Sequence, residues 1–238
     1  MAITSAIMGI NDEPFTKLFE IVIQLGAILS VVVLYWKKFF DFKNINFYFK
    51  LIIAVIPALI VGAVFKGYID QALDNLTFIA CVMVAGGILL LFIDKLFAKT
   101  TIQQEEGISI PKAFVIGCFQ CFSIVFPGLS RSAASIAGGM QQKLTRTLAA
   151  EFSFFLAVPT MFAASVKSFY DVYKLHPEVL VKDNMTILAI GAVVSFVVAL
   201  IAVKSFITYL QKHGFKIFGI YRIILGVVIL LLIWKGIL

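Results

Sequence analysis

Six apolar runs divide this chain, and a helix that crosses a lipid bilayer needs such a run of about 20 residues. Charged residues make up only 14% of the sequence, against about 25% in soluble domains. A chain of this composition could not cover its apolar surface with polar side chains in water. We therefore predict an all-α polytopic membrane protein with six transmembrane helices, in which residues 1–238 form a single membrane domain. The apolar runs are 20–36, 51–65, 78–97, 152–169, 187–206 and 217–234.

The net charge of +7 comes from basic residues that lie mainly in the loops between the apolar runs. Cytoplasmic loops of membrane proteins carry an excess of lysine and arginine, so this charge indicates orientation and not a nucleic-acid partner. If the two basic clusters of the chain are both cytoplasmic, residues 98–151 begin and end on the cytoplasmic side. The clusters are Lys37, Lys38, Lys43 and Lys50, and Lys204, Lys212, Lys216 and Arg222.

Residues 113–140 form a seventh apolar region, which Pro127 and Gly128 interrupt. Because two full crossings need about 40 residues, this region is too short to cross the bilayer twice. Irregular backbone inside a bilayer is tolerated only where protein or a water-filled cavity surrounds it. The region is therefore predicted to form a re-entrant helical hairpin, whose two short helices meet near residues 127–130.

The two halves of the chain resemble each other, as in the pairs 84–93 with 224–233 and 19–28 with 150–159. Three spans in each half predict an inverted-topology repeat, made of residues 1–99 and 113–238. Sites in such proteins lie near the bilayer midplane, where broken helices meet. Pro127 precedes Glu151 by 24 residues, and the same count back from Glu20 passes Met1. The first repeat is therefore expected to be N-terminally incomplete, with residues 1–14 as the returning arm of a second hairpin.

The hairpin tip has the residue types of a phosphate site. Pro127 and Gly128 break the first helix, and the backbone amides of residues 129–132 begin the second, where a helix favours an anion. Gly128 and Leu129 are therefore candidates for substrate binding. Ser130 and Ser132 add hydroxyl donors. Arg131 is permanently charged and can donate to two phosphate oxygens at once. An arginine inside a membrane segment is by default a functional candidate.

The small residues that follow the hairpin tip can also be explained by helix packing instead of ligand binding. Ala133, Ala134, Gly138 and Gly139 are typical of helices that pack closely in a membrane. Close packing accounts for these residues but leaves Arg131 unexplained. We therefore favour the anion site.

Three more polar residues are candidates for substrate binding: Glu20, Gln24 and Glu151. Glu20 and Gln24 are four residues apart and share one helix face. They could line a cavity with Arg131, or lie at the membrane interface near their helix end. Glu151 could bind substrate or serve as a structural partner of Arg131. The sequence leaves these alternatives open.

Four stretches of the chain resemble the undecaprenyl-diphosphate phosphatases of bacteria, the bacitracin-resistance type. Members of that family have six spans and two re-entrant hairpins in an inverted repeat, which agrees with the architecture predicted above. The similarity covers nearly the whole chain, and the PGLSRS block is its most specific part. The stretches are FEIVIQLGAILSVVVLYWKK (19–38), IPALIVGAVF (56–65), GCFQCFSIVFPGLSRSAASIAGGM (117–140) and AAEFSFFLAVPTMFAA (149–164).

The resemblance implies a hydrolase that removes the terminal phosphate of undecaprenyl diphosphate. Its product is the lipid carrier for peptidoglycan precursors, so the activity supports cell-wall biogenesis and cell shape and confers bacitracin resistance. Arg131, Ser130 and Ser132 would be the catalytic residues in this chain. The implied location is the bacterial inner membrane, with multiple passes, and the implied partners are the lipid substrate, the bilayer and, as an option, a second copy in a homodimer.

The chain departs from the family pattern at its start. Family members begin with a segment that holds two glutamates four residues apart and then a Pro-x-Ser-Ser-Thr-Gly-His run, and this sequence begins just after that run. The resemblance implies a divalent cation, Mg or Ca, whose expected ligands are absent from this chain. A protein that starts at Met1 is therefore expected to have little activity. The alternatives are a secondary transporter of an anionic substrate and an inactive truncated remnant of the phosphatase.

Overall fold

The computed structural model describes residues 4–5, 8–10, 13–41, 44–179 and 181–236. Six helices in these ranges are long and apolar enough to cross a membrane, and no β-strand occurs in them. The predicted all-α polytopic membrane protein is confirmed. The six helices are α2 (Pro14–Leu34), α4 (Ile45–Val64), α6 (Leu76–Leu96), α9 (Arg146–Leu175), α10 (Lys182–His213) and α11 (Lys216–Trp234).

The helices extend beyond the apolar runs that predicted them. α2 begins at Pro14, because a proline in the first turn loses no helical hydrogen bond. α9 and α10 contain 30 and 32 residues, so their ends include polar turns. Short elements connect the long helices, namely α3 (Trp36–Phe39), α5 (Lys66–Asp74) and the 3₁₀ turns η1 (Glu105–Gly107) and η2 (Pro177–Val179). Of the predicted returning arm at residues 1–14, positions 1–3, 6–7 and 11–12 lie outside the described residues.

The chain forms two compact units, and each takes segments from both halves of the sequence. The first unit comprises residues 1–43 and 157–206, and the second comprises residues 44–156 and 207–238. In the first unit, Gly26 of α2 lies against the backbone of Ala192 in α10. Ser195 of α10 also donates a hydrogen bond to the carbonyl oxygen of Ile23 at 2.6 Å.

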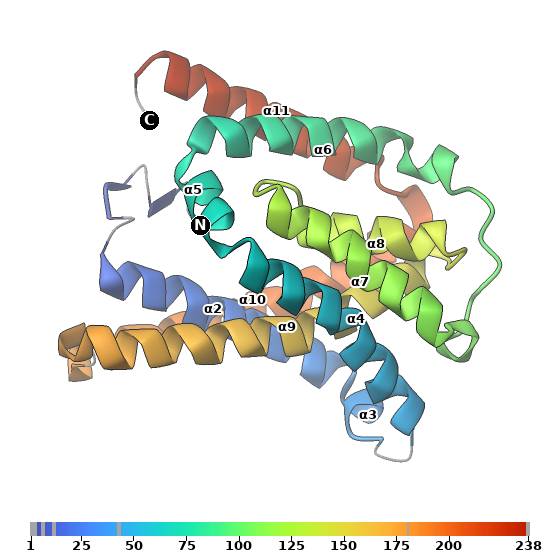
Figure 1. Cartoon of the computed structure of the whole chain (residues 1–238), viewed down its shortest axis with the longest axis horizontal. Helices are drawn as coiled ribbons and strands as arrows, with labels where there is room; N and C mark the ends of the chain where they lie inside the picture. Colours follow the sequence, from blue (N-terminus) through green and yellow to red (C-terminus); the bar gives the residue numbers. More distant parts are fainter. Residues whose placement is uncertain (1–3, 6–7, 11–12, 42–43, 180, 237–238) are drawn as a thin grey trace. The chain divides into compact units, whose positions relative to one another are not determined.

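In the second unit, α6 and α11 lie side by side (Figure 1). A Cβ on Gly219 would lie 2.7 Å from the carbonyl oxygen of Gly87, and one on Gly226 would lie 3.1 Å from that of Ala80. The two helices therefore run antiparallel with their backbones in close contact, as small residues allow in membranes. These are the helices whose sequences resemble each other at 84–93 and 224–233, although the division into repeats stays a prediction.

The predicted hairpin is present as two short helices, α7 (Ile110–Val125) and α8 (Arg131–Gln141). They pack antiparallel, because Gly138 of α8 lies against Phe119 and Ile116 of α7. On its other side, α7 presents Gly117 to the backbone of Ala54 in α4. The prediction that residues 113–140 form two helices and not one span is confirmed.

The end of the hairpin opposite its turn is tied down by hydrogen bonds. The carbonyl oxygen of Lys143 accepts from the amides of Thr101 and Ile102, at 2.9 and 3.0 Å, and the Thr145 amide donates to Ile102 at 2.9 Å. Asp94 at the end of α6 accepts from Arg146 Nε at 2.6 Å and from the Phe215 amide at 2.8 Å. This network joins the hairpin to three neighbouring helices.

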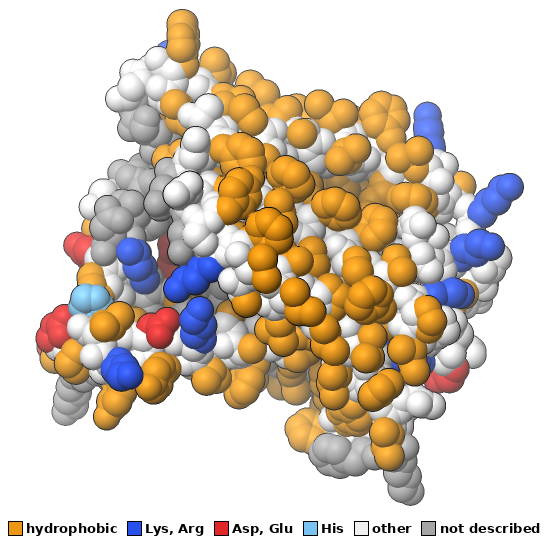
Figure 2. All heavy atoms as spheres, viewed as in Figure 1, with side chains coloured by type: hydrophobic (Ala, Val, Ile, Leu, Met, Phe, Trp, Pro, Cys, Tyr) orange, Lys and Arg blue, Asp and Glu red, His pale blue; other side chains and the backbone are white. Residues whose placement is uncertain are grey.

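Most lysines of the predicted basic loops lie in helices, namely Lys37 and Lys38 in α3, Lys50 in α4, Lys204 and Lys212 in α10, and Lys216 in α11. Lys50 lies inside α4 and is buried, and its Nζ donates to the carbonyl oxygen of Glu105 at 3.0 Å. On the face that Figure 2 shows, hydrophobic side chains cover most of the surface, and charged side chains lie mainly toward its left and right sides. Such a surface suits a lipid environment and not water.

Candidate phosphate-binding site at the hairpin turn

The turn between α7 and α8 is a β-turn of four residues, Phe126 to Leu129. The Leu129 amide donates to the carbonyl oxygen of Phe126 at 2.9 Å. Pro127 occupies the second position, and Gly128 in the third has φ +99°, the arrangement of a type II turn. A Cβ on Gly128 would also clash with the carbonyl oxygen of Ile79 in α6. The Pro-Gly pair therefore sets both the fold of the turn and its contact with α6.

Unpartnered donors gather where α8 begins. Ser130 is the N-cap, and its Oγ accepts from the Ala133 amide at 3.3 Å. The amides of Ser130, Arg131 and Ser132 donate to no group in the described part of the chain. The Arg131 side chain is half-buried, and its Nη1 atom is buried without a hydrogen-bond partner among the described residues. A buried donor without a partner is costly, so this cluster is suited to bind an anion.

One predicted contact needs a correction. We expected the amides of residues 129–132 to face the anion, but the Leu129 amide closes the turn. The carbonyl oxygen of Gly128 also accepts a hydrogen bond, from Arg222 of α11. Gly128 and Leu129 therefore shape the site through the backbone, and the free amides begin at Ser130.

A second arginine forms a hydrogen bond with the turn. Arg222 of α11 donates from Nη2 to the carbonyl oxygen of Gly128. Its Nε atom is buried and has no partner among the described residues. Sequence reasoning placed Arg222 in a basic loop, but it lies inside α11. The available signal was its position within the apolar run 217–234, where an arginine is rare.

The comparisons with known proteins decide the family. The chain matches the family described as "Bacitracin resistance protein BacA" over residues 1–228. An undecaprenyl-diphosphatase of Flavobacterium johnsoniae is 53% identical over 233 residues, which cover 98% of this chain and 86% of the relative. Relatives with the same printed name in Porphyromonas gingivalis and Bdellovibrio bacteriovorus are 46% and 42% identical over 253 and 239 residues, which cover 100% and 99% of this chain and 89% and 88% of those proteins.

The chain belongs to the BacA family. The resemblance noted from the PGLSRS block is therefore confirmed. In this BacA family member the block covers the turn and the first turn of α8, so the most specific part of the resemblance coincides with the unpartnered donors.

A second residue that sequence reasoning missed is Gln120 of α7. Gln120 has only 1% of its surface exposed. Both side-chain atoms of its amide, Oε1 and Nε2, lack a partner among the described residues. The sequence signal was weak, because an uncharged polar residue between Cys118 and Cys121 reads as ordinary packing.

Ser132 and its neighbour Ser135 differ in their contacts. Ser135 is buried and its Oγ donates to the carbonyl oxygens of Arg131 and Ser132, at 2.9 and 3.2 Å, and lies 2.6 Å from Ser153 Oγ of α9. These contacts hold the first turn of α8 against α9. Ser132, by contrast, is half-buried, which keeps its hydroxyl available for the role predicted from the sequence.

The three carboxylate and amide candidates lie on α2 and α9. Glu20 is half-buried in α2 and accepts from Ser5 Oγ at 3.1 Å, and Gln24 is exposed. Both belong to the first unit and Arg131 to the second, so a cavity that they share stays a prediction. Glu151 is half-buried in α9, and none of the ion pairs found among the described residues joins it to Arg131.

The described residues do not form a metal site. No group of three His, Cys, Asp or Glu side chains in the described ranges converges on one point. Cys118 and Cys121 are free thiols. The described part of the chain thus does not fit the divalent cation that the resemblance implies, and the contacts considered below are those of protein groups.

Proposed function

We propose that this chain hydrolyses undecaprenyl diphosphate to undecaprenyl phosphate and inorganic phosphate, and that the head group binds at the turn between α7 and α8. Membership of the BacA family supports the reaction, as does the printed name of the relatives, undecaprenyl-diphosphatase. The observation that carries the binding site is the buried, unpartnered Nη1 of Arg131 beside three unpartnered amides.

The proposed roles follow from the geometry of the turn. Arg131 and the amides of Ser130 to Ser132 would donate to phosphoryl oxygens and stabilise the charge that develops on them in the transition state. The hydroxyls of Ser130 and Ser132 would orient the same group. Arg222 would act indirectly. It donates a hydrogen bond to the carbonyl oxygen of Gly128 and so fixes the direction of the amides that follow.

The proposed setting is the bacterial inner membrane. The six membrane helices support a multi-pass protein in a bilayer, and the lipid substrate requires one. Hydrolysis there would return undecaprenyl phosphate to the synthesis of peptidoglycan. An abundant enzyme would also reduce the pool of diphosphate available to bacitracin, which agrees with the family description.

The test combines binding with turnover. The purified protein in detergent is mixed with undecaprenyl diphosphate, and the melting temperature and the phosphate released are both measured. The assay is repeated with Arg131→Lys and with a fusion that carries the N-terminal segment of the Flavobacterium johnsoniae relative. We expect the substrate to stabilise the wild-type protein but not Arg131→Lys, and phosphate release to be highest in the fusion.

Two results would count against the proposal. The first is a folded fusion protein that releases no phosphate from undecaprenyl diphosphate. The second is movement of phosphate across a proteoliposome membrane without hydrolysis, which would favour a secondary transporter.

A further inference from the structure

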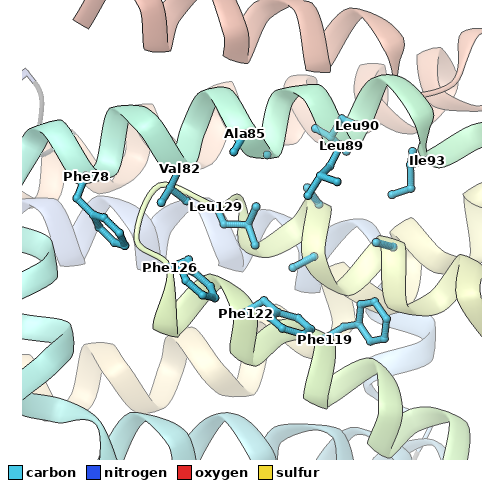
Figure 3. Close-up of a pocket in the computed structure, with 14 residues that line it drawn as sticks. Phe78, Val82, Ala85, Leu89, Leu90, Ile93, Phe119, Phe122, Phe126 and Leu129 are labelled. Atoms are coloured by element: carbon cyan, nitrogen blue, oxygen red, sulfur yellow. The ribbon is translucent and has the colours of Figure 1, made fainter. Parts of the chain in front are cut away.

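An apolar groove of about 540 Å³ runs along the hairpin within the second unit (Figure 3). Gly86 and Leu90 of α6 and Ala134 of α8 are buried and form its floor. Phe122 and Phe126 of α7 form the facing wall, with 51% and 41% of their surfaces exposed. All residues that line the groove are hydrophobic or glycine.

The small residues of α8 explain why the groove exists. Gly138 lies against Phe119 of α7, and Gly139 lies against Ala149 of α9, so these two glycines serve close packing. Ala133 and Ala137 instead line the groove. Their short side chains leave space between α8 and α6 that longer side chains would fill. The small residues of α8 thus serve close packing at Gly138 and Gly139 and line the groove at Ala133 and Ala137.

The groove begins at the candidate phosphate site. Leu129 closes the turn through its amide and lines the groove with its side chain. Ala133, whose amide donates a hydrogen bond to Ser130 Oγ at 3.3 Å, lines the groove as well. The apolar path and the cluster of anion donors therefore share residues on both sides of Arg131.

We propose that this groove holds the isoprenoid tail of the substrate next to its diphosphate, an inference that rests on the proposed function. The substrate is one molecule with an anionic head and a long branched apolar tail. Of all described features, the groove and the turn together offer a place for both parts without a gap between them. Figure 3 shows the aromatic side chains of α7 directed toward α6 across the space that the tail would occupy.

The groove acts by shape and not by hydrophobicity. Lipid tails in the bilayer are as apolar as the groove, so moving an isoprenoid tail into it gains little hydrophobic free energy. What the groove can provide is a fixed path that directs the diphosphate to Arg131. Blocking the path is therefore expected to reduce turnover of a long-tailed substrate and to leave a substrate with almost no tail unaffected.

Ala137→Phe tests this directly, because position 137 lies about 9 Å along α8 from Arg131. In the fusion protein, we expect kcat/KM for undecaprenyl diphosphate to fall about tenfold, because the new ring would occupy the space of the tail and overpack the groove. We expect kcat/KM for isopentenyl diphosphate, with its single isoprene unit, to change less than twofold. Ala85→Phe in the opposite wall should behave in the same way. The matched control is Ile88→Phe, on the exposed face of α6 outside the groove, which should leave both substrates unaffected. Equal losses for the two substrates, or no loss for either, would overturn the inference.

A second experiment decides the matter without turnover. A photoreactive analogue of undecaprenyl phosphate is cross-linked to the wild-type protein in phosphatidylglycerol vesicles, and the labelled peptides are identified. We expect labels on α6, α7 and α8 that undecaprenyl phosphate displaces and excess phosphatidylglycerol does not. Labels that either lipid displaces equally would make the groove an ordinary lipid contact. If no form of the protein releases phosphate from any substrate, the proposed function fails, and the cross-linking still decides what the groove binds.

Discussion

The two ends of the α7–α8 hairpin differ in how their polar groups are used. At the end opposite the turn, Lys143, Thr145 and Arg146 all have partners on neighbouring segments, and Asp94 accepts two hydrogen bonds. At the turn, the amides of residues 130–132 and one nitrogen of Arg131 donate to nothing in the described ranges. Both ends belong to the same unit.

This difference distinguishes the polar groups that stabilise the hairpin from those that are available to bind a ligand. Saturated polar groups stabilise a fold, whereas buried donors without partners cost free energy and persist where a ligand can satisfy them. The first end fixes the hairpin among α6, α9 and α11, and so the second end can present its donors in a defined direction. Substitutions at the turn should therefore reduce activity, and substitutions at the fixed end should reduce stability.

With turnover measured in the fusion that carries the N-terminal segment of the relative, the largest effect is expected for Arg131→Lys. Lysine keeps the charge but loses the planar group that donates to two oxygens at once. Loss of one transition-state donor of this kind costs about 2.7–4 kcal/mol, or about 100- to 1000-fold in turnover. The measurement is the turnover of undecaprenyl diphosphate together with the melting temperature. A variant that melts well below the wild type would instead make Arg131 a structural residue like those at the opposite end.

A smaller loss, about tenfold in turnover, is expected for Arg222→Met. Methionine has a similar length but cannot donate to the carbonyl oxygen of Gly128, and such a bond from a charged donor contributes about 1.5–3 kcal/mol. Because Arg222 acts through the turn, Arg222→Lys should recover part of the activity. Equal losses in the methionine and lysine variants would show that a simple positive charge at this place does not help to position the turn.

Some of this architecture was predictable from local sequence and some was not. Pro127-Gly128 inside an apolar region predicted the hairpin, because the φ of Gly128 and the fixed ring of Pro127 are properties of those two residues alone. The role of Arg222 depends on the packing of α11 beside α6, which brings a residue of the last helix to a turn far away in the sequence. The helix ends were predicted too short, since the polar first and last turns of α9 and α10 carry no apolar signal.

Ser130→Ala should have a modest effect on turnover, about threefold to tenfold. The hydroxyl caps α8 by accepting from the Ala133 amide, and loss of an N-cap typically costs about 1 kcal/mol. Ser130→Asn, which can also cap, serves as the matched control and should retain the stability of the wild type. A loss as large as that of Arg131→Lys would assign Ser130 a direct part in the chemistry.

The smallest effect on turnover is expected at the fixed end, for Asp94→Asn. The change weakens the contacts with Arg146 Nε and the Phe215 amide, but both side chains of the ion pair are partly exposed. Such pairs contribute up to about 1 kcal/mol. We expect a melting temperature a few degrees lower and turnover within twofold of the wild type. A strong loss of turnover in a stable Asp94→Asn protein would remove the distinction between the two ends.

The most direct test of the account is the position of the phosphate in a complex. A structure of the protein in a lipid nanodisc with undecaprenyl phosphate would show it. The account predicts phosphate oxygens within hydrogen-bond distance of the Ser130, Arg131 and Ser132 amides and of the Arg131 guanidinium. A phosphate bound elsewhere, with the donors at the turn unchanged and still without partners, would contradict it.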